Sequence, residues 1–173
     1  PLSDAHGRSQ SDPLYEDESR AALREQLRRL IGDVSPPERI RELDEAARFD
    51  QDLYDAPAAI DVLAIGGPED EGGSGDIRDQ IVVMEELAAG PTSMAAFAVL
   101  QFMGIQILGS YASPAQREVL RDLMQGRQKV SFAMSEPTSS TDIARSMRTR
   151  AKKIVGGYQI TGHKTWISAA SIA

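Results

Sequence analysis

The sequence of 173 residues contains no cysteine, two histidines and few aromatic side chains, which make up 5% of the chain. Disulfides, iron–sulfur clusters and thiolate zinc sites are excluded, because each of them requires cysteine. His6 and His163 are too few for a histidine-rich metal site. A Ser-His-Asp triad is possible on composition, but no motif around either histidine supports one.

Net positive charge is also lacking, since the formal net charge is −7 at pH 7. Proteins that bind nucleic acids or anionic membranes use lysine and arginine to neutralise phosphates, so neither class of partner is expected. One local basic patch is present near the C-terminal end of the sequence. It consists of Arg145, Arg148, Arg150, Lys152 and Lys153.

The chain opens at Pro1 with a polar, irregular stretch and shows no basic and apolar leader, so secretion is not expected. Arginine is preferred over lysine, a bias typical of GC-rich bacterial genomes, and we expect a cytoplasmic protein. Residues 1–17 are expected to form a flexible arm. A hydrophobic content of 41% is sufficient for a real core in the remainder.

Helical periodicity dominates the sequence from Glu18 to Gly126. Apolar residues at helical spacing, together with proline and glycine stop signals, set the limits of the expected helices. These lie at residues 18–32, 38–49, 77–89, 92–111 and from 113 onward, with a short element at 56–64. Residues 66–76 contain five glycines, a proline and four acids, which indicate a connecting loop. That loop lacks the spacing of a phosphate-binding motif.

The segment Thr92–Tyr111 is apolar almost all round, and its length would allow a membrane span. Gln101 and Gln106, together with small residues at Gly104 and Gly109, argue against that interpretation. We therefore expect no membrane span, but a helix that is buried on all sides inside a helical domain.

After Gly126 the pattern changes to short strands, expected at residues 130–134, 146–155, 158–161 and 165–168, with a tight turn at Gly156-Gly157. Helices followed by strands indicate an α+β chain with two domains. We predict an all-helical N-terminal domain over residues 18–127, followed by the beginning of an antiparallel β-barrel-like domain over residues 128–173. That second domain is apparently truncated, because so few short strands cannot close a barrel.

Two stretches of this second region could carry chemistry. In FAMSEPTSSTD, residues 132–142, an expected strand runs into a proline turn, so that backbone groups and hydroxyls are free to face a polar ligand. An ordinary Ser/Thr-rich loop with Asp142 capping a turn is the alternative. Trp166 packs in a core or forms a flat wall against an aromatic ligand. In a strand, Ser168 and Lys164 would lie on the same side as Trp166, because side chains two positions apart share a face. The default interpretation of Lys164 is an exposed lysine in contact with solvent.

Several consecutive segments together resemble one family, the acyl-CoA dehydrogenases, over residues 18–173. They are GGPEDEGGSG followed by VVMEELA, then GSYASPAQREVLRDLMQG, FAMSEPTSSTD and GYQITGHKTWIS. The resemblance implies an FAD cofactor, an acyl-CoA substrate in fatty acid metabolism and a homo-oligomer, dimer or tetramer. It also implies that electrons leave through an electron-transfer flavoprotein.

The same resemblance assigns roles to residues of this sequence. Phe132, Met134 and Ser135 would contact the edge of the flavin ring. Trp166 and Ile167 would form its aromatic wall, and Ser168 would make a polar contact. Thr141 would lie near the acyl-CoA thioester, and Ser140 beside the cofactor.

The sequence departs from the family pattern in its turn and in its length. Thr138 and Ser140 stand where the family has glycines, so side chains there cost strain if the backbone needs positive φ. The catalytic glutamate of the family is expected beyond residue 173, so no catalytic residue is assigned in this chain. Glu136 is not nominated, because in the family it belongs to the structural turn.

The expected function is an FAD-dependent acyl-CoA dehydrogenase that removes hydrogens from the α and β carbons of a CoA thioester. The chain would be its N-terminal half, and this half alone would be inactive. One alternative is a flavoenzyme of the same fold with other chemistry, such as an enoyl-CoA reductase, a nitroalkane oxidase or a flavin monooxygenase. Another is a non-enzymatic, truncated partner subunit.

Overall fold

The computed structural model describes residues 17–139 and 142–173. Residues 1–16 of the predicted arm and the predicted ligand contacts of Ser140 and Thr141 lie outside these ranges. The last residue of the predicted arm, Asp17, instead caps the first helix, because its side chain accepts from the amide of Arg20. The helices are α1 (Glu18–Val34), α2 (Pro37–Glu45), α3 (Gln51–Ala58), α4 (Ile77–Ala89), α5 (Thr92–Tyr111), α6 (Arg117–Met124) and α7 (Ile143–Ser146). Short 3₁₀ turns are η1 (Val62–Ala64), η2 (Glu69–Glu71) and η3 (Pro114–Gln116), and the strands are β1 (Arg150–Ile154) and β2 (Gly157–Thr161).

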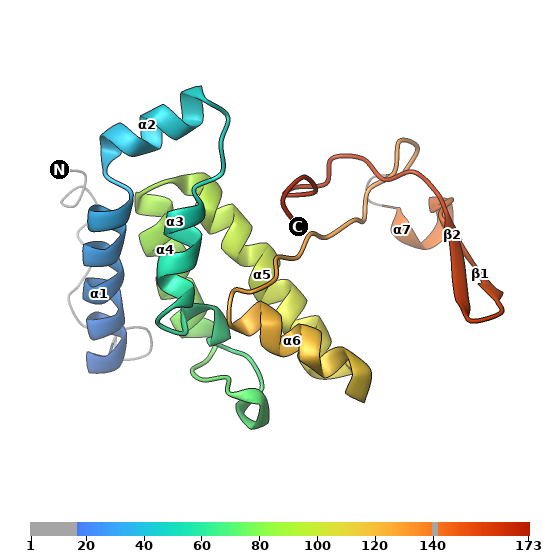
Figure 1. Ribbon diagram of the computed structural model, residues 1–173, viewed down its shortest axis with the longest axis horizontal. Helices are drawn as coiled ribbons and strands as arrows, with labels where there is room; N and C mark the ends of the chain where they lie inside the picture. Colours follow the sequence, from blue (N-terminus) through green and yellow to red (C-terminus); the bar gives the residue numbers. More distant parts are fainter. Residues whose placement is uncertain (1–16, 140–141) are drawn as a thin grey trace.

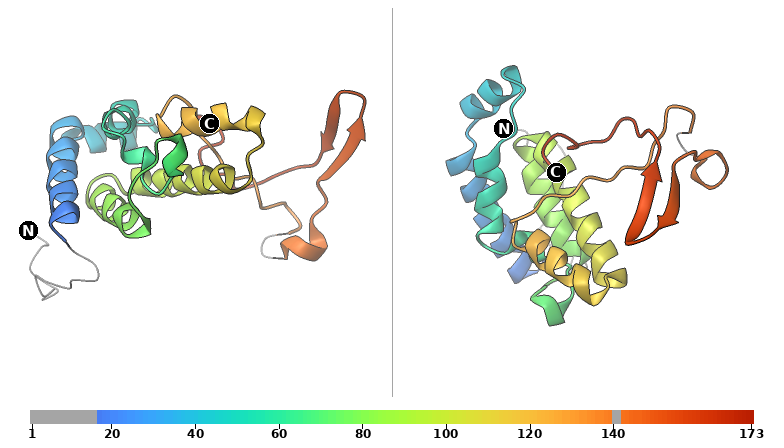
Figure 2. Two further views of the ribbon diagram at one scale, coloured as in Figure 1. Left: turned by 90° about the horizontal axis from the view of Figure 1, so that it is seen from below. Right: turned by 45° about the vertical axis from the view of Figure 1, so that its right-hand side comes forward.

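Helices α1 to α6 form a bundle, whereas α7 and the β1–β2 hairpin project to one side of it (Figure 1). Two long connecting segments run between the bundle and the hairpin, one leading out and one leading back (Figure 2). The expected fold class is confirmed: a helical N-terminal region is followed by the start of a small antiparallel sheet.

The core of the bundle lies around α5, which packs against α4 and α6. Leu27 of α1, Leu53 of α3 and Val83 of α4 are almost fully buried, as are Phe97 and Phe102 of α5. Burial of each such side chain stabilises the fold by roughly 1.5–3 kcal/mol relative to its exposure to water. The predicted core of the helical domain is therefore present.

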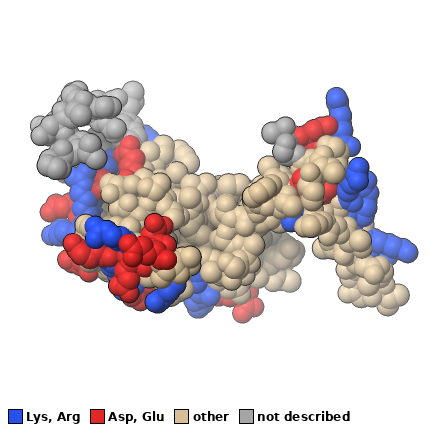
Figure 3. All heavy atoms as spheres, turned by 90° about the horizontal axis from the view of Figure 1, so that it is seen from above, with Lys and Arg blue, Asp and Glu red and all other residues tan. Residues whose placement is uncertain are grey.

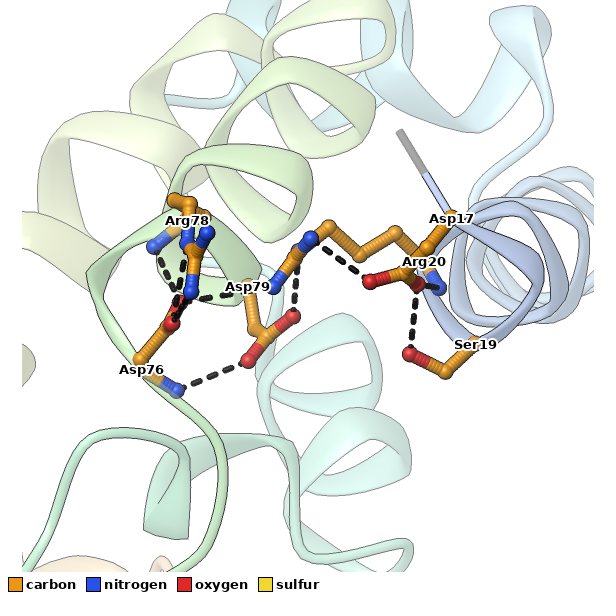
Figure 4. A network of polar contacts seen from close by, with 6 residues as sticks. All are labelled: Asp17, Ser19, Arg20, Asp76, Arg78 and Asp79. Atoms are coloured by element: carbon orange, nitrogen blue, oxygen red, sulfur yellow. Dashed lines mark hydrogen bonds and ion pairs between the residues drawn. The ribbon is translucent and has the colours of Figure 1, made fainter. Parts of the chain in front are cut away.

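Charged residues fix α1 against the start of α4 (Figure 4). Arg20 is 7% exposed, and its Nε donates to Asp79 Oδ1 at 2.9 Å. Asp79 Oδ2 also accepts from the amide of Asp76 at 2.7 Å, while Asp76 accepts from the amide of Arg78, which makes a capping box for α4. The same aspartates therefore begin one helix and hold another beside it.

Helix α5 has the predicted bounds, but the prediction that it is buried on all sides is wrong. Met103, Ile107 and Tyr111 are 36%, 44% and 84% exposed, because no other described element covers that side of the helix. Among the described helices, α5 alone is long and apolar enough to cross a membrane, a criterion that the core helix of a bundle also meets. Its position in the core, with Gln101 fully buried, is that of the central helix of a bundle.

The β region has fewer strands than predicted. Strands β1 and β2 pair antiparallel in the register Arg150↔Thr161 to Ile154↔Gly157, and Gly156 has a φ of 83° in the predicted turn. Residues 130–134 and 165–168 are not strands. Extended backbone is interrupted at residues 165–168 because Trp166 has a φ of 59°, and Ala169 follows with a φ of 62°. The parity argument that placed Trp166 and Ser168 on one side of a strand is therefore wrong.

Candidate functional site

A buried carboxylate lies at the centre of the turn between the connecting segment and the hairpin. Glu136 is 5% exposed and accepts hydrogen bonds from the amide of Arg148 at 2.6 Å and the amide of Thr149 at 2.9 Å. The Thr149 hydroxyl and Lys164 Nζ also donate to it, at 2.5 Å and 3.0 Å. The Thr149 hydroxyl, followed by the Arg148 amide, lowers the pKa of Glu136 to about 2.

The turn itself is closed by two backbone hydrogen bonds between Glu136 and Ser139, at 2.9 and 3.0 Å. Thr138 is exposed at its tip and is not among the described residues with positive φ. The strain expected from a side chain at this position is therefore absent. Asp142 comes just before α7, as expected of a cap, but its carbonyl rather than its carboxylate accepts bonds, from the hydroxyls of Ser139 and Ser146.

The segments that carry the predicted ligand residues lie side by side. The amide of Thr165 donates to the carbonyl of Ser135 at 2.9 Å. Further along the same pair of segments, the Ser131 hydroxyl donates to the carbonyl of Ser168 at 2.7 Å. These contacts bring Ser135 next to Thr165, the residue that precedes Trp166, so the two segments to which the resemblance assigns flavin contacts are neighbours.

This pair of segments keeps polar groups available for a ligand. Among the described residues, the amides of residues 132–135 and the hydroxyls of Ser135 and Ser168 have no hydrogen-bond partner. Trp166 is 94% exposed and Phe132 is 42% exposed. Free donors beside an exposed flat ring suit a planar aromatic ligand with a polar edge, which is the chemistry of an isoalloxazine.

A cavity of about 780 Å³ opens next to this pair of segments, between α2, the start of α5 and the C-terminal residues. Its apolar lining includes Ile40, Met94, Phe97, Leu100 and Ile172, and Ser168 lies at its wall. Ligand pockets typically occupy about 300–1,000 Å³. A smaller groove of about 330 Å³ lies between α4 and α5, with Ile77, Met84 and Met103 among its lining residues.

Charged side chains are unevenly distributed on the face seen in Figure 3. Acidic and basic residues alternate over the helical bundle, whereas lysine and arginine border the hairpin. All residues of the predicted basic patch are exposed, namely Arg145, Arg148, Arg150, Lys152 and Lys153. The stretch between the bundle and the hairpin shows few charges on this face, so that a largely uncharged stretch separates the two charged ends.

Comparison with known proteins identifies the family. Residues 17–127, more than half of the chain, match the family described as acyl-CoA dehydrogenase, N-terminal domain. The chain belongs to the acyl-CoA dehydrogenase family. This is a family of oxidoreductases, and the resemblance seen in the sequence motifs is confirmed.

Three similar proteins show how much of an acyl-CoA dehydrogenase is present. Benzylmalonyl-CoA dehydrogenase of Aromatoleum aromaticum is 34% identical over 136 residues, which are 76% of this chain and 35% of that protein. The caffeyl-CoA reductase–Etf complex subunit CarC of Acetobacterium woodii is 28% identical, over 92% of this chain and 42% of that protein. The crystal structure of a probable acyl-CoA dehydrogenase from Mycobacterium abscessus is 28% identical and superposes with a TM-score of 0.83, covering 92% of this chain and 43% of that one. The chain therefore spans less than half the length of these relatives.

Two residues of the site were not recognised from the sequence. Lys164 was interpreted by default as a solvating lysine, but its side chain is only 22% exposed and its Nζ contacts Glu136 and the Met134 carbonyl. Thr149 was given no role, and it binds the same carboxylate. The sequence offered one signal for the contact between Lys164 and Glu136. Lys164 lies two residues before the lone tryptophan, and Glu136 directly precedes a proline in the other motif.

Proposed function

We propose that this chain is the N-terminal half of an FAD-dependent acyl-CoA dehydrogenase that carries out α,β-dehydrogenation of a CoA thioester. The single observation that carries the proposal is the approach of the Ser135 segment to the Trp166 segment, with free amides beside an exposed ring. When bound, FAD supplies the acceptor for the hydride that leaves the β-carbon. The residues of this chain bind the cofactor and exclude water from one of its faces.

Each residue of the proposed site is assigned one role in holding the cofactor or the substrate. Phe132, Met134 and Ser135 would contact the polar edge of the ring through their backbone groups and the Ser135 hydroxyl, where donors favour negative charge. Trp166 and Ile167 would hold the flat face of the ring, and the Ser168 hydroxyl would provide a polar contact. Thr141 and Ser140 retain their predicted roles near the thioester and the cofactor.

The cavity at α5 is proposed to hold the acyl group. It is lined mainly by apolar side chains, including Phe97 and Leu100, and it reaches Ser168, which is one of the proposed flavin contacts. An acyl chain in this cavity would have its thioester end near the ring. Arg41 and Arg48 also line the cavity, at its α2 side.

No residue of this chain is proposed as the base that removes the α-proton. Glu136 has the required functional group, but four donors hold it and its pKa is lowered to about 2. A carboxylate in that state is a weak base near neutral pH. The expected glutamate beyond residue 173 remains a prediction.

A second candidate function is reductive chemistry on an enoyl-CoA within the same fold. The observation that favours it is the similarity to CarC, whose name describes a caffeyl-CoA reductase–Etf complex subunit. The same name supports an electron-transfer flavoprotein as the redox partner of this chain. A homo-oligomer that completes the cofactor site is proposed from the family resemblance.

The test uses protein that is produced from the complete reading frame, which we call the expressed protein. A flavin absorption spectrum after purification, and loss of that absorbance when saturated acyl-CoA thioesters are added without oxygen, would support the dehydrogenase. Bleaching only by an external reductant, followed by recovery with an enoyl-CoA, would favour the reductase. A protein that neither contains nor binds FAD would contradict both functions.

A further inference from the structure

The side chain of Lys164 joins the two segments of the proposed flavin site. Its Nζ donates to the carbonyl of Met134 at 3.0 Å and to Glu136 Oε1 at 3.0 Å. The lysine side chain is 22% exposed and that of Glu136 is 2% exposed, so the ion pair is shielded from water. Trp166 follows Lys164 by two residues and is exposed.

The ammonium group has a permanent counter-charge. Glu136 receives two backbone amides and the Thr149 hydroxyl in addition to the lysine, so its carboxylate remains ionised. A charged and nearly buried partner holds Lys164 Nζ in one place, because moving it would leave the carboxylate underpaired. The ammonium is thereby fixed against the Met134 carbonyl.

The Met134 carbonyl belongs to the same peptide unit as the amide of Ser135. A charged donor on the carbonyl polarises that peptide and makes its N–H a stronger donor. The Ser135 amide has no hydrogen-bond partner among the described residues. The next carbonyl, that of Ser135, is held by the amide of Thr165 at 2.9 Å.

We propose that Lys164 is a positioning residue of the cofactor site, which sets the spacing between the Ser135 amide and the Trp166 ring and strengthens that amide as a donor to the edge of a bound flavin. This inference rests on the proposed function of the site. It predicts that Lys164 favours the more negatively charged, reduced form of the cofactor over the oxidised form, although it does not touch the ring itself.

The test compares Lys164→Met with Lys164→Arg in the expressed protein, with Lys152→Met on the exposed strand β1 as the matched control. FAD affinity is measured by titration, and the midpoint potential by equilibration with a dye of known potential. Lys164→Met should weaken FAD binding at least tenfold, about 1.4 kcal/mol. A further tenfold loss of preference for reduced flavin would lower the midpoint potential by about 30 mV.

Lys164→Arg should restore most of both properties, because it keeps a charged donor, and Lys152→Met should match the wild type. If Lys164→Met lowers thermal stability but leaves the potential unchanged, Lys164 is merely structural and the inference is wrong. Wild-type affinity and potential in Lys164→Met would overturn it as well. A wild-type protein that binds no FAD would instead contradict the proposed function.

The positioning role of Lys164 can also be measured without a bound cofactor, and therefore without the midpoint potential of the flavin. Trp166 is the only tryptophan of the sequence, so its fluorescence in the isolated chain reports on this site alone. Lys164→Met should lower the fluorescence anisotropy of Trp166, and Lys164→Arg should leave it close to the wild type. Equal anisotropy in all three proteins would contradict the positioning role.

Discussion

The carboxylate of Glu136 and the hydroxyl of Thr149 lie 2.5 Å apart, which joins the turn after the first connecting segment to the residue that precedes strand β1. Residues that are thirteen positions apart in the sequence thus share one buried contact. The carboxylate holds the turn and the hairpin together, because it also accepts from the two backbone amides just before the strand.

The stability of the isolated chain should therefore depend on pH through Glu136. Its folded pKa of about 2 lies below the ordinary 4.5, so its contribution is fully present above pH 4.5 and is lost as pH falls toward 2. Glu136→Gln should be less stable than the wild type at pH 7, and the difference should shrink between pH 4.5 and 2. Urea unfolding at several pH values measures this difference. A difference that stays constant over that range would show that the charge of Glu136 is unimportant.

Trp166 should be more important for binding than for folding. Its φ of 59° costs a non-glycine residue roughly 1–2 kcal/mol, and its ring makes little contact because it is 94% exposed. Trp166→Gly should therefore change the free energy of unfolding by less than about 1 kcal/mol, since relief of strain offsets the greater freedom of the unfolded glycine. In the expressed protein the same change should weaken FAD binding by about tenfold or more, through loss of ring contact.

Trp166→Phe is the matched variant, because it keeps an aromatic ring and the same backbone strain. It should bind FAD better than Trp166→Gly but should not gain stability. If Trp166→Gly binds FAD as well as the wild type, Trp166 is not the wall of the cofactor site.

Gly104 should be intolerant of a side chain, although it lies within a helix. A Cβ at this position of α5 would approach Val130 Cγ1 to 2.6 Å, so Gly104→Ala should destabilise the chain by about 1–3 kcal/mol. Gly32→Ala in α1 is the control, since nothing lies within 4 Å there, and it should stabilise by about 0.5–1 kcal/mol. Denaturant unfolding compares the two.

Adding Val130→Ala to Gly104→Ala should recover part of the loss, because it removes the atoms that would clash. If the loss is the same with and without the valine, the contact between α5 and the connecting segment is not the cause.

A larger side chain in the α5 cavity should compete with substrate. Ala96 lines this cavity and is exposed, so Ala96→Trp should fold but should weaken binding of acyl-CoA by about tenfold. FAD affinity should be unchanged, because the substitution is on the helix and not on the flavin segments. Ser110→Trp places the same side chain on an exposed position of α5 outside the cavity and should leave both affinities alone. Equal acyl-CoA binding in the two variants would show that the acyl group lies elsewhere.

The sequence was sufficient for the helices whose ends are marked by local chemistry. The predicted bounds of α4 and α5 agree with the structure, since Asp76 and Asp79 cap the start of α4 and Gly90-Pro91 separates the two helices. The element expected at residues 56–64 was misplaced. Helix α3 begins at Gln51 because Asp50 accepts from the amide of Leu53, a cap that periodicity alone does not show.

The candidate site was predictable in its segments but not in its geometry. The motifs around Ser135 and Trp166 were recognised by resemblance, and the structure brings the two segments together. Strand parity failed after Thr165 because the backbone at Trp166 turns to positive φ, which no local pattern announced. Lys164 was missed because its partner is 28 positions away, so that only tertiary structure distinguishes it from a surface lysine.

The two connecting segments make the folding of the hairpin region dependent on the helical bundle. Val130 is held by Gln101 of α5, and Ile172 at the other end packs on the hydrophobic core of the bundle. The residues between these two anchors include α7 and the β1–β2 hairpin, and bringing the two anchors together costs entropy that increases slowly with the number of residues between them. The exposed hairpin contributes little burial toward that cost, so we expect the helical bundle to fold first. We therefore expect a destabilising substitution in the core of the bundle to loosen the distant segments around Ser135 and Trp166 as well, even where none of their own residues has changed.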